Sequence, residues 1–550
     1  MTVESETANP TADPHGENEP IVLTGEDLTV DRVVQVARAG AKVTVGADAL
    51  NRVREARRVV EQVLAQGAPV YGVNTGLGSL SRHRIAPEDL EQFSFATVAD
   101  QTATYGRPLR TDVVRAMMLA RANGMAKAGV GVRRELLLQL VELLDRGVHP
   151  VVRDVGSVGQ ADLSEMSDIG KVLIGRGRAE VGGQILPGAE ALARAGMTPL
   201  TLAPKEALAL ISSNGVTVGH GSLVLADAAD LVDGFQIAGA RSLEGYAGNL
   251  SPIHPVSTRL RPHLGQIAAA RRLRELLEGS RLWRPGAARH LQDPLSFRCI
   301  PQAHGALYDV MSYARGTMEI ELNSAGDNPM VATEDETIVS VGNFDVVSLA
   351  MAFDLLRLGL AQVASVANER VQKLLWREFS GLPTGLADHD GATGGLRPLG
   401  RWMAARAAEA RFLANPASLD YRGQLAEGIE DHASMAPLSV RKTSELVSVC
   451  HRMVALELIV AAQAVDLGER APLGRGTRHA YDTVRECVPR LVDETEWAAD
   501  IDRLVDLVAE GELTDRVATD AGEREPLSEY DAPGLATGAR APDPTSRRGP

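Results

Sequence analysis

The chain has 550 residues and a formal net charge of −15, and this acidic balance argues against a duplex nucleic acid as its partner. Hydrophobic residues make up 44% of the chain and aromatic residues only 4%, so alanine, leucine and valine must fill most of the core. This composition favours closely packed helices.

The two ends of the chain differ in composition from the rest. Residues 1–20 contain acids and prolines but no lysine or arginine, which argues against a signal peptide or a mitochondrial presequence. Residues 521–550 are similarly poor in large apolar side chains, so both ends are expected to be disordered tails. Between them we expect an N-terminal domain over 21–200, a central helix bundle over 201–470 and a C-terminal helical segment over 471–520.

Apolar residues recur at helical spacing through most of the chain between the tails. The span 346–376 contains no proline and would extend about 45 Å as one helix. Several long, alanine-rich helices predict a mainly α fold built as a long-helix bundle, and their excess apolar surface indicates oligomeric packing. The predicted helices cover 53–64, 112–127, 133–144, 204–234, 346–376, 399–413 and 438–467, and a short strand pair is expected within 172–185.

The cysteines and the hydropathy pattern indicate the cellular compartment in which the protein is expected. Cys299, Cys450 and Cys487 lie far apart and show no metal-ligand spacing, so we expect reduced thiols and no metal site. We find no apolar run of about 18 residues that is free of charge, and therefore expect no membrane span. These features predict a cytoplasmic protein.

Seven polar or glycine-rich segments interrupt the helical pattern, although a helix bundle does not require them. Each can be explained singly as a turn, because Asn-Gly and Asp-Asn-Pro favour turns. Together, in one chain and in this order, they indicate a shared function. They are Tyr71-Gly-Val-Asn-Thr-Gly-Leu-Gly78, Gly156-Ser-Val-Gly159, Ser213-Asn-Gly215, Gln292-Asp-Pro-Leu-Ser-Phe-Arg298 with Gln302, Glu321-Leu-Asn-Ser-Ala-Gly-Asp-Asn-Pro329, Gly342-Asn-Phe344 and Glu430-Asp-His-Ala-Ser-Met435.

In this order the segments resemble the ammonia-lyases and aminomutases that act on histidine, phenylalanine and tyrosine. The resemblance covers roughly residues 21–468. It implies a mainly helical homotetramer whose active sites are built from loops of more than one subunit. It also implies a small carboxylate or amino acid as the substrate.

The resemblance further implies roles for single residues. Tyr71 matches the family's catalytic base, a role that requires a setting that favours the phenolate. Arg298 matches the arginine that binds the substrate carboxylate, which suits its planar guanidinium. Asn214 matches an asparagine that contacts the cofactor in relatives, and we place it among the binding residues. Asn328 and Phe344 match other pocket positions. Glu409 also matches a pocket position, and we assign it to catalysis with Tyr71. Gln302 is expected to support the pocket.

The pattern breaks directly after Gly159. Active relatives continue with Ala-Ser-Gly-Asp-Leu, and their Ala-Ser-Gly triad cyclises with loss of water to give methylidene-imidazolone, the electrophile that activates the substrate amino group. Here the chain reads Gln160, Ala161 and Asp162, without a serine to dehydrate or a glycine whose bare backbone permits ring closure. We therefore expect a degenerate loop and no such cofactor.

Other departures concern the pocket wall. Leu295 stands where the family has a second catalytic tyrosine, and Asp345 replaces a histidine that often follows Gly-Asn-Phe. Asp100 and Gln101 fall on the Ser-His pair of histidine lyases, so Gln101 takes the place of the selectivity histidine. Because the polar and apolar replacements point in different directions, the substrate stays open.

Three acids follow the altered loop. Asp162, Glu165 and Asp168 are spaced so that they would lie roughly along one face of a helix. They could supply a general acid or a hard-cation site. We favour a simpler interpretation, in which one acid lies at a helix N-terminus and the others are solvated.

Three functions follow from these observations. We favour an enzyme of the aromatic amino acid lyase family that works without methylidene-imidazolone and uses Tyr71 for proton transfer. Elimination, addition, isomerisation or cyclisation of a small carboxylate or amino-acid-derived substrate would then be accessible. The first alternative is a non-catalytic homologue that binds an amino acid or has a structural role. The second is a conventional ammonia-lyase, which the missing triad disfavours.

Overall fold

The computed structural model describes residues 19–100, 104–388, 394–419, 423–468, 470–491 and 498–521. Within these ranges α-helices dominate, and the strands form only sheets of two or three members. The expectation of a mainly α fold is confirmed. The tails expected over 1–20 and 521–550 fall almost entirely outside the described residues.

Contacts divide the chain into two compact units, each assembled from segments distant in sequence. The contiguous domain boundaries expected from the sequence remain predictions. Unit 1 comprises Met1–His220, Glu321–Asp345 and Leu425–Glu430, and unit 2 comprises Gly221–Ile320, Val346–Gln424 and Asp431–Pro550.

The strands of unit 1 form four small sheets. The expected strand pair is present as the β6–β7 hairpin, whose turn residues Gly182 and Gly183 both have positive φ. Val172, which we had placed near this pair, belongs to a helix instead. Strand β1 (Ile21–Leu23) pairs in parallel with β2 (Val43–Val45), and all other pairs are antiparallel. The two-stranded antiparallel sheets are β3 (Tyr105–Pro108) with β5 (Arg153–Val155), and β8 (Met330–Ala332) with β9 (Thr337–Val339). In the three-stranded sheet, β6 (Arg178–Val181) lies between β4 (Val148–Pro150) and β7 (Gln184–Pro187).

Helix α4 (Thr111–Ala126) forms the centre of unit 1 and is buried along almost its whole length. The first turns of α9 (Gly215–Tyr246) pack closely against it. A Cβ on Gly219 would lie 2.5 Å from the backbone nitrogen of Met117, so this approach requires glycine. The other helices of the unit are α1 (Val30–Ala37), α2 (Ala47–Ala65), α3 (Leu90–Ala99), α5 (Arg134–Asp145), α6 (Leu163–Leu173), α7 (Gly188–Arg194) and α8 (Glu206–Ile211).

The helix expected over 204–234 is broken into α8 and α9. Residues Ser212, Ser213 and Asn214 separate the two helices. The carbonyl of Ser213 accepts a hydrogen bond from the backbone nitrogen of Asp162 at 2.7 Å. This long-range bond replaces a helical one and places Asn214 at the start of α9.

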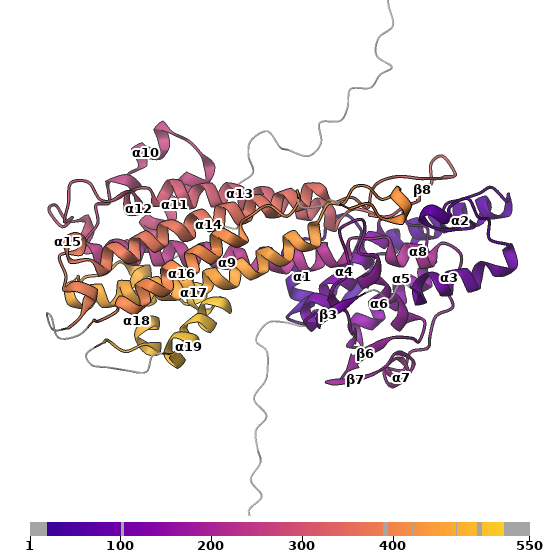
Figure 1. The fold of residues 1–550 in the computed structure, drawn as a ribbon, viewed down its shortest axis with the longest axis horizontal. Helices are drawn as coiled ribbons and strands as arrows, with labels where there is room; N and C mark the ends of the chain where they lie inside the picture. Colours follow the sequence, from indigo (N-terminus) through magenta and orange to yellow (C-terminus); the bar gives the residue numbers. More distant parts are fainter. Residues whose placement is uncertain are drawn as a thin grey trace, which may run out of the picture. The chain divides into compact units, whose positions relative to one another are not determined.

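Long helices dominate unit 2. Helices α14 (Val347–Leu375) and α17 (Ala436–Gly468) lie side by side, and α16 (Arg397–Leu413) contacts both (Figure 1). These three confirm the helices expected over 346–376, 399–413 and 438–467. The remaining helices are α10 (Pro255–Leu260), α11 (Leu264–Leu276), α12 (Leu295–Arg298), α13 (Ile300–Leu322), α15 (Arg377–Ser380), α18 (Arg475–Cys487), α19 (Ala498–Ala509) and α20 (Glu512–Ala521).

Two helical stretches of the described chain are long and apolar enough to cross a membrane, by length and composition alone. They are Glu206–Tyr246 and Val347–Leu375, and they correct our expectation that no such stretch exists. The most apolar window of the first is 94% buried inside the protein. Two such helices are weak grounds for a membrane protein, because core helices have the same length and composition.

Candidate active site

The loop that carries Tyr71 makes a tight turn after α2. Gly72 has a φ of 63°, and a Cβ at this position would overlap the side chain of Leu208 in α8. Glycine therefore permits both the turn and its contact with α8. The Tyr71 hydroxyl accepts a hydrogen bond from the backbone nitrogen of Gly78 at 3.0 Å. This contact holds the phenol of Tyr71 against the end of its own loop.

The loop after Gly156 is closed by a serine and an aspartate. Ser157 Oγ donates to Asp162 Oδ1 at 2.9 Å and accepts from the backbone nitrogen of Gly159, also at 2.9 Å. Between them, Ala161 has a left-handed φ of 62°. The loop is thus a defined turn, even though its residues depart from the family sequence.

Hydrogen bonds join this loop to the start of α9. Asp162 is fully buried, and its Oδ2 accepts from the backbone nitrogen of Thr217 at 2.9 Å. Together with the bond from Asp162 to the Ser213 carbonyl, this contact fixes the loop on both sides of Asn214.

Two buried carboxyl groups follow one another on the first turn of α6. Asp162 and Glu165 are 0% and 2% exposed, so our expectation of solvated acids is wrong for Glu165. Burial raises the pKa of Asp162 to about 6, and burial with the adjacent Asp162 raises the pKa of Glu165 to about 8. Glu165 Oε1 accepts from Ser157 N at 2.8 Å, while Oε2 has no hydrogen-bond partner among the described residues. Glu165 is therefore a neutral carboxylic acid at pH 7.

The side chain of Asn214 is buried without a hydrogen bond. Both its Oδ1 and its Nδ2 lack a partner within the described part of the chain. They border a cavity of about 30 Å³, lined also by Arg121 and Glu321, which has room only for a water-sized group. An unpaired buried amide is costly, so this position is suited to receive a polar group.

Asn328 and Phe344 belong to the same part of unit 1. Gln160 forms an isolated antiparallel bridge with Asp345, which places the neighbouring Phe344 beside the altered loop. Asn328 Oδ1 accepts from the backbone nitrogen of Val341 at 2.8 Å. Unit 1 therefore brings the altered loop, Asn214 and Phe344 close together, while the roles of these residues remain predictions.

Three other predicted residues lie in unit 2. Arg298, at the end of α12, donates to Gln292 Oε1 at 2.9 Å. Glu409 in α16 forms an ion pair with Arg406 at 2.6 Å. Gln302 Oε1 is buried without a hydrogen-bond partner in the described ranges. Their assignment to one active site with Tyr71 remains a prediction.

Two of the residues that depart from the family pattern at the pocket wall are Gln101 and Leu295. Gln101 lies outside the described residues. Leu295 begins α12, and 61% of its surface is exposed.

A group of buried charges that the sequence did not predict lies near Asn214. Lys205 Nζ lies 2.8 Å from Asp327 Oδ2, and both side chains are 0% exposed. Arg121 donates to the carbonyl of Gly326 at 3.2 Å. Burial, with Asp345 nearby, raises the pKa of Glu321 to about 6. The signal in the sequence was Arg121, in the apolar part of the helix expected over 112–127, and a charged side chain of this kind is usually solvated.

The three acids after the altered loop do not act as one cluster. Asp162 binds Thr217, whereas Asp168 accepts hydrogen bonds from Thr104 and Lys171. Among the described residues, no group of three or more His, Cys, Asp and Glu side chains could hold a metal ion.

Comparison with known proteins identifies the family. The family model for aromatic amino acid lyases matches residues 28–486. A histidine ammonia-lyase of Gloeobacter violaceus is 40% identical over 505 residues, covering 91% of this chain and 98% of the relative. Another, of Alkaliphilus oremlandii, is 38% identical over 498 residues, covering 90% and 98%. The chain belongs to the aromatic amino acid lyase family. It is therefore a lyase-type enzyme of a family that acts on amino acids, which disfavours the non-catalytic alternative.

Solved structures confirm the fold of this lyase. Ergothionase from Treponema denticola, an ergothioneine-degrading enzyme in complex with desmethyl-ergothioneine sulfonic acid, has a TM-score of 0.87 and 31% identity, covering 90% of this chain and 99% of that chain. Histidine ammonia-lyase from Trypanosoma cruzi has a TM-score of 0.83 and 29% identity, covering 91% and 95%.

The comparisons overturn our expectation that methylidene-imidazolone is absent. The two bacterial histidine ammonia-lyases match this lyase over 98% of their length, and such similarity implies that it shares their cofactor. One side of the site fits such a group, because the Asn214 amide is buried and unpaired in the described structure. The loop does not fit it, because Gln160 and Ala161 provide no serine that could lose water. The chemistry assigned to this chain therefore rests on its own side chains.

Proposed function

We propose that this lyase removes the amino group of a small amino acid, histidine or a close analogue, as an ammonia-lyase. The observation that carries the proposal is the 38–40% identity to proteins named histidine ammonia-lyase over 98% of their length. Loss or gain of a whole catalytic segment would shorten such a match. The continuous match instead supports a shared reaction class.

In the proposed reaction, the oxygen of Tyr71 removes a proton from the substrate carbon next to the α-carbon. The electrons of that C–H bond form the C=C bond, and the amine leaves with the electrons of the C–N bond. The hydrogen bond from the Gly78 backbone nitrogen holds the Tyr71 oxygen in place. Arg298 would hold the substrate carboxylate with its guanidinium. Glu409 would assist the proton transfer, and Asn328 and Phe344 would border the substrate.

We also propose that the enzyme is a homotetramer in the cytoplasm. Apolar side chains remain exposed along one face of α14, where Met351, Leu355 and Leu358 are 59%, 42% and 49% exposed. Such a stripe favours burial against another subunit. The free thiols of Cys299, Cys450 and Cys487 suit a reducing compartment.

A second candidate is elimination from an ergothioneine-like betaine, in which a trimethylammonium group takes the place of the amine. The likeness to the ergothionase, with a TM-score of 0.87, favours it specifically. A trimethylammonium group is already a good leaving group, so base catalysis by Tyr71 contributes directly to this reaction.

One experiment tests both candidates. The purified enzyme is incubated with histidine, phenylalanine, tyrosine and ergothioneine, and the release of ammonia and of trimethylamine is measured. Ammonia from histidine supports the first proposal, and trimethylamine from ergothioneine supports the second. No release from any of the four contradicts both.

The role of Tyr71 is tested by Tyr71→Phe. We expect turnover to fall by about 10² to 10⁴-fold, because the variant keeps the ring and loses the proton acceptor. The matched control is Tyr105→Phe, since Tyr105 is 67% exposed in β3 and outside the site. Equal turnover in Tyr71→Phe and Tyr105→Phe would show that Tyr71 is not the base.

A further inference from the structure

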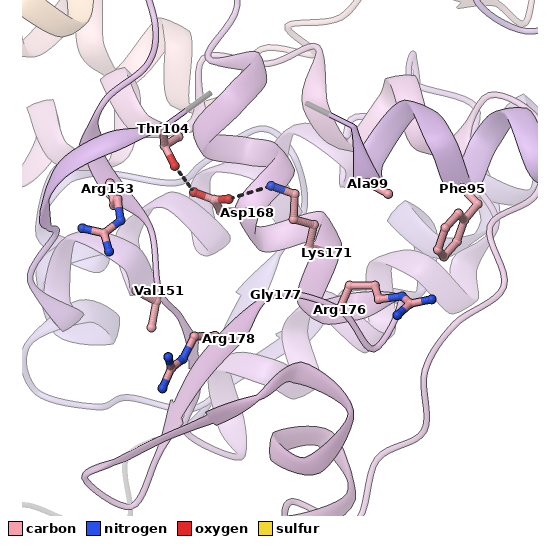
Figure 2. Close-up of a pocket in the computed structure, with 10 residues that line it drawn as sticks. All are labelled: Phe95, Ala99, Thr104, Val151, Arg153, Asp168, Lys171, Arg176, Gly177 and Arg178. Atoms are coloured by element: carbon pink, nitrogen blue, oxygen red, sulfur yellow. Dashed lines mark hydrogen bonds and ion pairs between the residues drawn. The ribbon is translucent and has the colours of Figure 1, made fainter. Parts of the chain in front are cut away.

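Another cavity of unit 1 has a volume of about 490 Å³, and none of its lining residues is among the described residues of the candidate active site. It lies among the end of α3, the middle of α6 and the start of β6 (Figure 2). Cavities of this size are typical of sites for small molecules. The proposed reaction assigns no role to the residues that line it.

The side chains around this cavity are strongly basic. Its lining contains Arg153, Lys171, Arg176 and Arg178, with Asp168 as the only acid among the lining residues. The whole chain has a net charge of −15, so this concentration of positive charge runs against the overall balance. A cavity lined by one sign of charge raises the local concentration of counter-ions.

Asp168, the single acid in the lining, is already paired with a lysine of the same cavity. Asp168 accepts hydrogen bonds from Thr104 Oγ1 at 2.7 Å and from Lys171 Nζ at 3.0 Å, as the dashed lines in Figure 2 show. The side chains of Lys171 and Asp168 are only 9% and 13% exposed. This buried pair forms a fixed, nearly neutral part of the wall. It also gives Asp168 a structural role in place of the solvated one that we had favoured.

The three arginines, in contrast, have no carboxylate partner among the described residues. Arg153 donates to the carbonyl of Gly106 at 2.7 Å, which leaves the positive charge uncompensated. Arg176 and Arg178 line the cavity and are exposed. Guanidinium groups in this state are well suited to bind carboxylate or phosphate oxygens in pairs.

An aromatic ring completes the wall. The guanidinium carbon of Arg176 lies 5.6 Å from the centroid of the Phe95 ring, and Figure 2 shows the two side chains together on one side of the cavity. Ala99 and Val151 add apolar surface. A ligand with a flat ring could pack against Phe95 while its acidic group binds the arginines.

We propose that this cavity binds a small organic anion that combines a planar ring with a carboxylate or a phosphate. Two sources have this chemistry: an unsaturated aryl carboxylate of the kind that the proposed elimination would release, and a nucleoside monophosphate. The first source rests on the proposed function, but the site itself does not. Lys171 lies nine residues beyond Asp162, about 13 Å along α6, so the ligand occupies a site separate from the altered loop.

The test is calorimetric titration of the full-length enzyme with trans-3-(imidazol-4-yl)acrylate, with adenosine monophosphate and with inorganic phosphate, at constant ionic strength. We expect saturable binding of one of the two ring-containing anions, and weaker binding of inorganic phosphate. Arg176→Gln and Arg178→Gln should each weaken that binding at least tenfold. Both arginines are exposed, so these variants should fold normally.

The matched control is Arg134→Gln, which removes an exposed arginine of the same unit outside the cavity. It should leave the affinity unchanged, and so should Tyr71→Phe if the ligand binds away from the active site. The inference is overturned if neither ring-containing anion binds saturably, if inorganic phosphate binds as tightly as they do, or if Arg176→Gln and Arg178→Gln bind like Arg134→Gln. Failure of turnover alone would affect the proposed function and not this site.

Discussion

Glu165 shows how strongly the surroundings of one residue set its chemical state. Its carboxyl group lies beside buried Asp162, and no cation pairs with it in the described structure. Burial raises its pKa from 4.5 to about 8, with Asp162 adding to the effect. A buried carboxyl group is much less costly when it is neutral, so Glu165 keeps its proton at pH 7.

This state predicts how stability depends on pH. Between about pH 4.5 and pH 8, the folded protein holds a proton on Glu165 that the unfolded chain releases. Its contribution to the free energy of unfolding therefore decreases with rising pH, by about 1.4 kcal/mol per unit within that window. Glu165→Gln, which is neutral at every pH, should reduce this loss. We expect the unfolding temperature of the variant, measured at pH 5, 6.5 and 8, to rise relative to that of the native enzyme as the pH increases.

The control for this prediction is Glu190→Gln, because Glu190 is exposed at the surface of α7. Its unfolding temperature should follow that of the native enzyme at all three pH values. Parallel pH profiles for Glu165→Gln and the native enzyme would mean that Glu165 is ionised in the folded state.

At the candidate site, the sequence offered residues for roles that remain predictions, but it did not predict their environments. Tyr71 and Asn214 were named from short motifs, because those motifs need particular residue types. The burial of Glu165 was missed because it depends on Gly156, where a Cβ would come within 2.9 Å of Glu165 Oε1. Such a contact joins an irregular loop to the first turn of α6, and no periodic pattern in the sequence records it.

At the scale of elements, long helices were predicted well and interruptions were not. The helix expected over 346–376 is α14, because its apolar residues repeat without proline. The helix expected over 204–234 was wrong, because Ser213 gives its carbonyl to the distant Asp162. Local helix propensity predicted that the helix would continue past Ser213. A long-range hydrogen bond, which propensity does not describe, separates α8 from α9 there.

The packing of α14 on α17 includes a buried ion pair, and this pair makes a second prediction. Arg370 Nε and Nη2 lie 2.6 Å and 3.0 Å from the two carboxylate oxygens of Glu457, and both side chains are 0% exposed. Arg370→Met would leave Glu457 charged and unpaired. We expect it to lower the free energy of unfolding by about 3–5 kcal/mol, measured as a lower urea midpoint.

Two further variants separate the charge effect from lost packing. Adding Glu457→Met to Arg370→Met removes the unpaired charge and should restore most of the urea midpoint. Lys373→Met is the control on the same helix, because its pair with Glu369 is partly exposed and should be worth no more than about 1 kcal/mol. Equal losses in Arg370→Met and Lys373→Met would mean that the buried pair carries no special weight.

At the scale of the whole molecule, each unit is assembled from segments that are far apart in sequence. Glu321–Asp345 and Leu425–Glu430 join unit 1 although the chain around them builds unit 2. In the sequence these segments appear only as polar interruptions of the helical pattern, so the sequence suggested contiguous domains. From composition we expected oligomeric packing, and this stays a prediction; α14 does carry exposed apolar side chains.

The exposed stripe of α14 makes the last prediction. Met351, Leu355 and Leu358 repeat at helical spacing on one exposed face. In the proposed tetramer, Leu355→Glu would bury an unpaired carboxylate against the next subunit, so the assembly should dissociate into smaller species in sedimentation velocity. Turnover should fall with it, since the family resemblance places loops of more than one subunit at each active site. Leu260→Glu, at a leucine that is 78% exposed in α10, should keep the native sedimentation coefficient. If Leu355→Glu sediments like Leu260→Glu, this face of α14 is not a subunit contact.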